Sequence, residues 1–125
     1  MAGEPILIVD DNPTNAKLAR IILEDEGFVV RTAENAEEAL RILSEFEPRM
    51  ILMDVQLPGM DGLELTCKLR SDVRYRSVWI VALTAYAMKG DAEKAYAAGC
   101  DGYLTKPINP DVLPVHVASY LAKDR

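Results

Sequence analysis

Several polar residues that could act together on a phosphoryl group stand at the ends of apolar segments of this chain. The residues are Asp10, Asp11, Asp54, Thr84 and Lys106, and they follow residues 6–9, 50–53, 78–83 and 102–105. A carboxylate can act as a nucleophile, clustered carboxylates can hold a divalent cation, and a lysine can bind a phosphoryl oxygen. The set indicates metal-assisted phosphoryl transfer if the fold brings these residues together.

The three aspartates would repel one another in a shared cleft. At roughly 5 Å and an effective dielectric constant near 20, one pair of carboxylates costs about 3 kcal/mol. A raised pKa or a bound cation relieves such repulsion. Because the cluster offers only oxygen ligands, we expect Mg²⁺, with Mn²⁺ as the alternative. Asp54 is then the nucleophile that forms an aspartyl phosphate, while Lys106 and the hydroxyl of Thr84 contact the phosphoryl oxygens.

Alternating segments along the chain predict five strands and five helices. The expected strands are residues 6–9, 28–32, 50–53, 78–83 and 102–105. The first helix is expected from Asn12 to Gly27, the second from Asn35 to Pro48, the third from Asp61, the fourth up to Gly99, and the fifth from about Asp111 to the C-terminus. Asn12 precedes Pro13, while Glu38 and Glu64 stand three residues after their caps, and both arrangements are typical of helix N-termini.

The strands read as continuous apolar runs, which is typical of a parallel sheet covered by helices on both faces. We therefore expect an α/β fold of the flavodoxin-like (βα)5 type, doubly wound, with strand order 2-1-3-4-5 and one domain over residues 1–125. In such sheets ligands bind beyond the carboxyl ends of the strands, where the winding reverses. That point lies between the first and third strands, so Asp10 and Asp11 should lie next to Asp54.

Composition excludes several classes of function. Half of the 125 residues are hydrophobic, so a folded core is expected, and the net charge of −6 disfavours binding to nucleic acids or to a membrane surface. No apolar run is long enough to span a bilayer, and the N-terminus lacks a signal-peptide pattern. Cys67 and Cys100 fit no metal-binding spacing and are expected to be reduced thiols in the cytoplasm.

Four motifs together resemble the receiver domain of two-component response regulators, including stand-alone receivers of a single domain. They are Val9-Asp10-Asp11-Asn12, the segment from Met53-Asp54 to Gly62, Leu83-Thr84-Ala85, and Lys106-Pro107. The resemblance implies a phosphorylation-activated switch or phosphorelay intermediate. A sensor histidine kinase or a histidine phosphotransfer protein would phosphorylate Asp54.

The same resemblance implies roles for individual residues. Mg²⁺ would be held by Asp11, Asp54 and the backbone carbonyl of Gln56, with Asp10 in support. Thr84 would turn toward the phosphoryl group, and Tyr103 would change rotamer with it. The domain would assist its own phosphoryl transfer and autodephosphorylation without being a turnover enzyme.

Partner contacts are also expectations from the resemblance. The phosphodonor would contact Asn12, Asn15, Leu18 and Ile108. A downstream effector would bind the face formed by the fourth helix, the fifth strand and the fifth helix, and the protein would be a monomer or a phosphorylation-dependent dimer. A cis peptide between Lys106 and Pro107 is a further hypothesis, because a tight turn must direct the lysine into the cleft.

Three alternatives stay open at this point. The chain could be a receiver excised from a hybrid kinase or a larger regulator, since residues 87–91 are similar to both kinds. A Mg²⁺-dependent phosphatase with an aspartyl nucleophile would need a DxD pair and a substrate cap, and Asp10-Asp11 lacks the intervening residue. A flavin carrier of the same fold would need a Ser/Thr/Gly-rich phosphate loop where the two aspartates stand.

Overall fold

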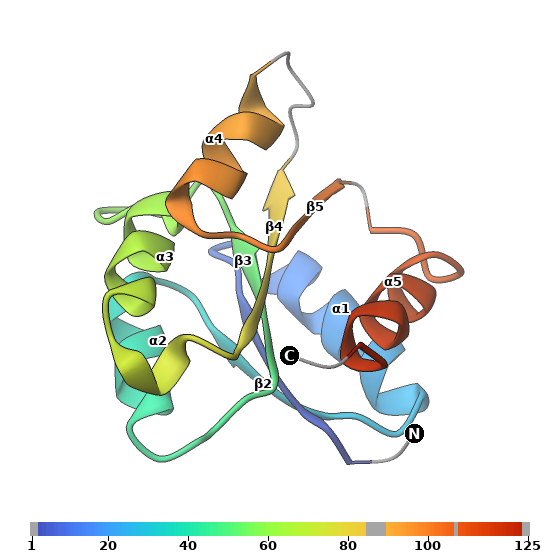
Figure 1. Ribbon diagram of the computed structural model, residues 1–125. Helices are drawn as coiled ribbons and strands as arrows, with labels where there is room; N and C mark the ends of the chain where they lie inside the picture. Colours follow the sequence, from blue (N-terminus) through green and yellow to red (C-terminus); the bar gives the residue numbers. More distant parts are fainter. Residues whose placement is uncertain (1–2, 85–89, 107, 124–125) are drawn as a thin grey trace.

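The computed structural model describes residues 3–84, 90–106 and 108–123. Its strands are β1 (Pro5–Val9), β2 (Val29–Ala33), β3 (Met50–Asp54), β4 (Trp79–Thr84) and β5 (Gly102–Thr105) (Figure 1). Its α-helices are α1 (Pro13–Asp25), α2 (Ala36–Leu43), α3 (Gly62–Arg70), α4 (Asp91–Ala98) and α5 (Leu113–Leu121), with a short 3-10 helix at Val73–Tyr75. No helix in these described ranges has the length and apolar character needed to cross a bilayer.

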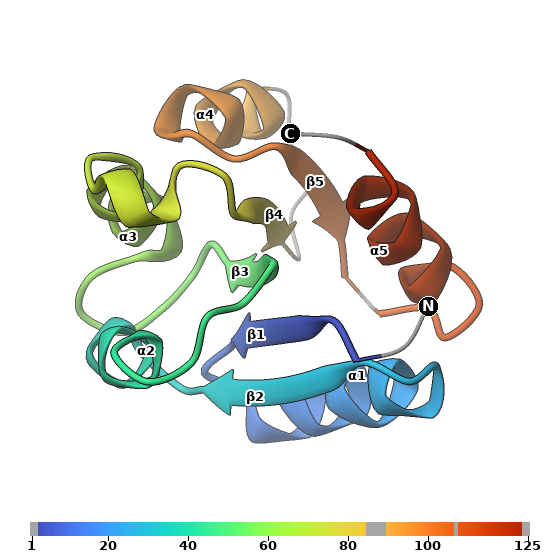
Figure 2. The same ribbon diagram turned by 60° about the horizontal axis from the view of Figure 1, so that its bottom comes forward.

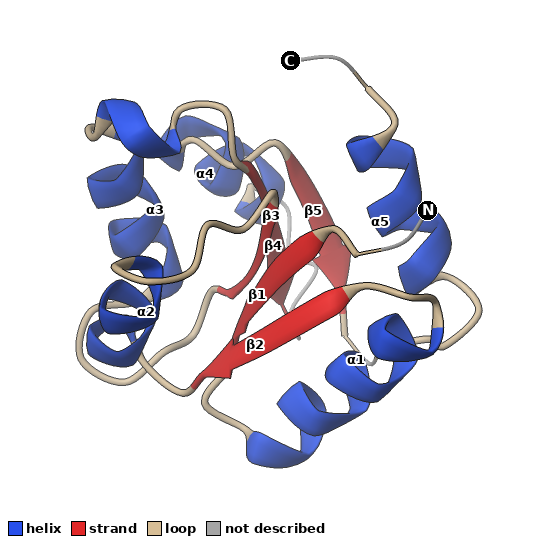
Figure 3. Ribbon diagram, turned by 90° about the horizontal axis from the view of Figure 1, so that it is seen from below, coloured by secondary structure: helices blue, strands red, loops and turns tan. Residues whose placement is uncertain are grey.

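The five strands form one parallel sheet in the order β2-β1-β3-β4-β5, which confirms the predicted fold class and strand order. Helices α1 and α5 cover one face, while α2, α3 and α4 cover the other (Figures 2 and 3). Alternate residues of the strands pack into two separate hydrophobic cores, one on each face of the sheet. Ile6 and Ile8 of β1 pack toward α1 and α5, and Leu7 and Val9 pack toward the other three helices.

Side-chain caps fix where three helices begin, as the sequence predicts. Asn12 accepts hydrogen bonds from the backbone amides of Thr14 and Asn15 at 3.0 and 3.2 Å. Asn35 accepts one from the amide of Glu38 at 2.8 Å. Asp61 caps α3 through the amide of Glu64, also at 2.8 Å. These bonds satisfy amides that have no partner inside the helix.

The predicted end of α2 and the predicted start of α5 differ from the structure. Helix α2 ends at Leu43, well before Pro48, because the hydroxyl of Ser44 donates to the carbonyl of Arg41 and ends the helix locally. Helix α5 begins at Leu113 and not near Asp111, because Asn109 accepts from the amide of Asp111 at 2.8 Å and holds a turn there. At α2 a side chain competes with the helical hydrogen bonds of the backbone, whereas at α5 the side chain and the carbonyl of Asn109 accept from the amides of a turn that precedes the helix.

Arg70, at the C-terminal end of α3, ties several elements together. Its Nε donates to the carbonyl of Gly99 at 2.8 Å, and its Nη1 donates to the carbonyls of Tyr75 and Val78, both at 2.8 Å. Its Nη2 pairs with Oδ2 of Asp101 at 2.7 Å, and both side chains are mostly buried. The guanidinium thus joins the end of α3 to the start of β4 and to the turn between α4 and β5.

We expect Arg70→Met to lower the free energy of unfolding by about 2 kcal/mol, because Asp101 and the carbonyls would keep their burial and lose their donor. Urea denaturation at neutral pH measures this change. Arg76→Met is the matched control, since Arg76 is exposed on the same segment, and it should change stability by less than about 0.5 kcal/mol. Equal stability of the two variants would contradict the role assigned to Arg70.

Candidate functional site

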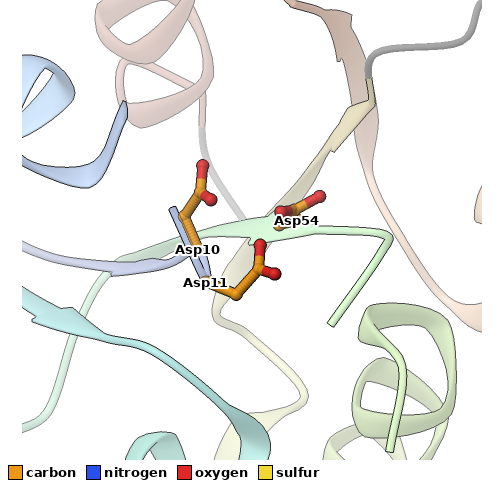
Figure 4. Close-up of side chains that lie close together, drawn as sticks. All are labelled: Asp10, Asp11 and Asp54. Atoms are coloured by element: carbon orange, nitrogen blue, oxygen red, sulfur yellow. The ribbon is translucent and has the colours of Figure 1, made fainter. Parts of the chain in front are cut away.

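Three carboxylates gather at the carboxyl ends of β1 and β3. The register that pairs Val9 with Met53 places Asp10 and Asp11 beside Asp54, and one oxygen of each lies within 4.8 Å of the others (Figure 4). Asp10 is 0% exposed and Asp54 is 4% exposed, whereas Asp11 is exposed to solvent. The predicted convergence of the three residues is confirmed.

Backbone amides hold the two buried carboxylates. Oδ1 of Asp10 accepts from the amide of Asn12 at 2.9 Å, so the start of α1 orients this side chain. Oδ1 of Asp54 accepts from the amide of Gln56 at 3.1 Å. Asp54 is the last residue of β3, so its backbone is fixed by the sheet while its carboxylate projects beyond the edge.

The ammonium group of Lys106 contacts both buried carboxylates. Its Nζ lies 3.1 Å from Oδ2 of Asp10 and 3.2 Å from Oδ2 of Asp54. Its backbone amide donates to the carbonyl of Thr84 at 2.7 Å, which fixes the end of β5 against the end of β4. The sequence placed Lys106 at this edge, but its double pairing with Asp10 and Asp54 emerges only from the structure.

The pKa values of these groups reflect burial and charge in competition. Burial raises the pKa of Asp54 to about 6, although the amide of Gln56 and the charge of Lys106 act in the opposite direction. Burial lowers the pKa of Lys106, but the hydrogen bond and charges of Asp10 and Asp54 outweigh it and raise that pKa above its ordinary value. At neutral pH Asp54 is therefore ionised and Lys106 is charged.

Thr84 lies on β4, the strand that pairs with the strand of Asp54, and Tyr103 lies on β5, one strand further from Asp54. Thr84 is the last residue of β4 and is buried, and the register pairs its neighbour Leu83 with Asp54. Tyr103 lies in β5 opposite Ala82 and packs, half-buried, against the core under α2, α3 and α4. Thr84 therefore lies at the same edge of the sheet as the carboxylates.

Gly62 is a site residue that sequence reasoning missed. A Cβ atom at this position would collide with the backbone carbonyl of Asp54. The amide of Gly62 donates to the carbonyl of Val55 at 3.0 Å, so the first turn of α3 lies directly against the end of β3. The Asp-Gly pair signals a turn in the sequence, but the close approach to Asp54 depends on tertiary packing.

Comparisons with known proteins agree with this geometry. Residues 6–118 match the response regulator receiver domain. The chain belongs to this family. The polar-differentiation response regulator DivK of Brucella anthropi is 41% identical over 116 residues, covering 93% of this chain and 94% of DivK. DivK of Brucella ovis is 40% identical with the same coverage.

Two solved structures are also similar. The chemotaxis response regulator CheY4 of Vibrio cholerae has a TM-score of 0.89 and 29% identity, covering 94% of this chain and 98% of that chain. The receiver domain of a Pseudomonas aeruginosa sensor histidine kinase has a TM-score of 0.88 and 34% identity, covering 98% and 100%. That domain was solved with a magnesium ion coordinated in its active site cleft.

This receiver domain is therefore a phosphorylation-activated switch of two-component signal transduction and not a classical enzyme. Domains of this family interact with histidine kinases or phosphotransfer proteins and with effectors. The family membership decides against the phosphatase and the flavin carrier that the sequence alone left open.

The residues expected to contact a phosphodonor differ in their solvent exposure and in the contacts they already make. Asn12 is exposed, but its side chain is engaged as the cap of α1. Asn15 is half-buried, while Leu18 is 40% exposed. Ile108 lines a small cavity of about 50 Å³ together with Leu83 and residues around the start of α5. The predicted cis peptide at Lys106-Pro107 lies outside the described residues.

The acidic cluster fits a hard divalent cation. Its donors are carboxylate oxygens only, which suit Mg²⁺. Two of the three carboxylates are buried and fixed by backbone amides, and the exposed Asp11 leaves the cluster open to solvent. Among the residues that the structure describes, Lys106 is the one cation paired with these carboxylates, and it faces two of the three, so the cluster keeps a net charge that a metal ion would neutralise.

We expect Asp11→Asn to raise the melting temperature of the metal-free receiver domain by about 3 °C, because it removes a repulsive charge that is exposed to solvent and therefore screened to about 1 kcal/mol. The same change should weaken Mg²⁺ binding. Thermal unfolding with EDTA and with Mg²⁺ measures both effects. Asp25→Asn, an exposed aspartate outside the cluster, should leave the Mg²⁺ dependence intact. Unchanged or lower metal-free stability of Asp11→Asn would mean that this carboxylate is structurally bonded.

Proposed function

We propose that Asp54 accepts the phosphoryl group from the phosphohistidine of a sensor histidine kinase or a histidine phosphotransfer protein. The observation that carries this proposal is a buried, ionised carboxylate at a strand end, next to a lysine and to two further carboxylates. Asp10 is equally buried and is likewise held by a backbone amide, so the choice of Asp54 rests on its place at the end of β3 within the receiver motif. We further propose that residues 1–125 work as one receiver domain in the cytoplasm.

The reaction needs a nucleophile, charge neutralisation and a fixed geometry. A carboxylate oxygen of Asp54 forms a bond to phosphorus while the bond from phosphorus to the histidine nitrogen breaks, and the nitrogen keeps the electron pair and takes up a proton. Lys106 then balances the charge of the phosphoryl oxygens. Asp10, Asp11, Asp54 and the backbone carbonyl of Gln56 would hold Mg²⁺, or Mn²⁺ in its place. The bound ion would supply neutralisation of carboxylate and phosphoryl charge.

Phosphorylation then acts as a switch through Thr84 and Tyr103. The hydroxyl of Thr84 turns toward the new phosphoryl oxygens, and Tyr103 changes rotamer as the end of β4 moves. The hydrogen bond from the amide of Lys106 to the carbonyl of Thr84 supports this coupling, because it links the ends of β4 and β5. The face formed by α4, β5 and α5 then binds the effector or a second copy of the domain.

The phosphodonor contacts Asn12, Asn15, Leu18 and Ile108 in this proposal. Leu18 and Asn12 are exposed on α1 and its cap, and Ile108 follows β5 on the edge that carries Lys106. The domain assists its own phosphoryl transfer and its autodephosphorylation, without repeated turnover of a substrate.

Incubation with acetyl phosphate followed by intact mass measurement tests this function. The wild-type domain should gain one phosphoryl group when Mg²⁺ is present and almost none in EDTA. Asp25→Asn is the control and should behave as the wild type does. An absence of the adduct in Mg²⁺, or equal adduct in EDTA, would contradict the proposal.

A further inference from the structure

A broad groove lies at the end of the sheet opposite the acidic cluster. It has a volume of about 800 Å³ and is bounded by residues 43–49, by residues 74–75 and 77–79, and by Lys123 after α5. Met50 and Trp79 begin β3 and β4 beside it, whereas the acidic cluster lies at the other ends of the strands. In Figure 1 the connection from α2 to β3 (green) crosses the lower part of the view to the start of β3.

Aromatic side chains form an apolar part of the groove lining. Phe46 and Tyr75 are half-buried and pack against the core under α2, α3 and α4. Trp79 is buried in the other core and packs against Tyr120, with 5.5 Å between the ring centroids. The rings are therefore held in place from behind. Rigid aromatic side chains of this kind are typical anchors for a bound apolar side chain.

Basic side chains surround these rings although the chain as a whole is acidic. Arg49, Arg74 and Lys123 line the groove, against two acidic residues, Glu45 and Glu47. Arg74 is paired with Asp72 at 2.7 Å and adds little net positive charge. Arg31 lies 3.4 Å from Glu45 and partly neutralises it. Arg49 and Lys123 are exposed, and neither forms an ion pair with any residue that the structure describes. The groove is thus locally basic on a chain with a net charge of −6.

We propose that this groove binds an acidic peptide segment of a partner protein, with one aromatic or aliphatic side chain on the surface of Tyr75 and Trp79. Acidic residues on either side of that anchor pair with Arg49 and Lys123. An apolar centre with a charged rim is the usual composition of a protein interface, and charge complementarity selects the partner. The volume lies within the range of ligand sites, roughly 300–1,000 Å³.

The position of the groove makes this binding independent of phosphorylation chemistry. A segment anchored there leaves the edge that carries Asp54 free. A partner could therefore hold the receiver domain by the groove while a phosphodonor reaches the acidic cluster. Binding to the groove is expected whether or not Asp54 accepts a phosphoryl group, so failure of one proposal leaves the other intact.

Trp79 is the only tryptophan of the chain and lines the groove, so its fluorescence reports binding. The probe is an acetylated, amidated peptide of four glutamates around a central phenylalanine, titrated into the wild-type protein at low salt. The comparison peptides replace either the glutamates by lysines or the phenylalanine by alanine. The double variant Arg49→Gln with Lys123→Gln removes the basic rim. Lys68→Gln with Lys94→Gln makes the same charge change at exposed lysines outside the groove.

The proposal expects a saturable change of Trp79 fluorescence with the acidic peptide, weakened at least about tenfold in the groove variant and less than about twofold in the control variant. The lysine peptide should not bind, and the alanine peptide should bind more weakly. Equal weakening in both variants, equal binding of the lysine peptide, or no saturable change would overturn it. Self-association that the groove variant abolishes would also overturn it, in favour of a second copy. Urea midpoints close to the wild-type value show that both variants fold.

Discussion

Lys106→Met is expected to lower the free energy of unfolding of the metal-free receiver domain by about 4 kcal/mol at neutral pH. Lys106 is the cation that faces Asp10 and Asp54, at 3.1 and 3.2 Å. Those carboxylates are 0% and 4% exposed, so their charges would stay buried without compensation. Removal of one partner of a buried pair typically costs about 3–5 kcal/mol. Methionine keeps most of the apolar stem of lysine, so the lower free energy of unfolding comes from the missing charge and not from lost packing.

The pH dependence of this loss has a definite sign. Because its carboxylate neighbours raise the pKa of Lys106 above the unfolded value, its stabilisation is fully present at neutral pH and is lost only as the pH rises through the folded-state pKa. In acid Asp54, whose pKa is about 6, becomes protonated, so the deficit of Lys106→Met should shrink. Urea denaturation in EDTA from pH 4 to pH 8 measures it. Lys94→Met, at an exposed lysine, is the control. A deficit below about 1 kcal/mol at pH 7.5 would contradict the buried pairing.

Asp54→Asn is expected to stabilise the metal-free domain by about 3 kcal/mol at pH 8. Burial raises the pKa of Asp54 from 3.8 to about 6, and each pKa unit corresponds to about 1.4 kcal/mol. The charged carboxylate is therefore unfavourable in the folded state, and asparagine removes the charge while keeping the size. The amide oxygen of the substituted side chain could still accept from the amide of Gln56, and Lys106 would keep Asp10 as its partner.

The advantage of Asp54→Asn should depend on pH in a predictable window. Between about pH 4 and pH 6 the folded protein binds a proton that the unfolded chain has released, so wild-type stability falls as the pH rises. The difference between variant and wild type should be full above pH 6 and should vanish near pH 4. Unfolding in EDTA at several pH values tests this. A difference that is constant with pH, or a less stable variant at pH 8, would show that the charge is not the cause.

Much of this site follows from local sequence signals. Asp10 and Asp54 each follow a continuous apolar run, and a parallel sheet with a known reversal point brings such strand ends together. Caps such as Asn12 and Asp61 are local hydrogen-bonding patterns, so the starts of α1 and α3 were predicted correctly. Residue types and their spacing were therefore enough for the strand order and for the convergence of the carboxylates.

Other features depend on distances that no local pattern contains. The double pairing of Lys106 requires the ends of β1, β3 and β5 to be a few ångströms apart. The need for glycine at position 62 arises from its contact with the carbonyl of Asp54. These features depend on contacts that form only in the folded chain.

The location of the phosphoryl group is the most direct test of the proposed chemistry. The wild-type domain would be phosphorylated with acetyl phosphate and Mg²⁺ and treated with sodium borohydride, which reduces an aspartyl phosphate to homoserine, and its peptides would then be sequenced by mass spectrometry. Homoserine should appear at position 54 and should be absent from Asp54→Asn treated in the same way. Homoserine at position 10 or 11, or the same extent of modification in the variant, would contradict the assignment of Asp54 as the phosphoacceptor.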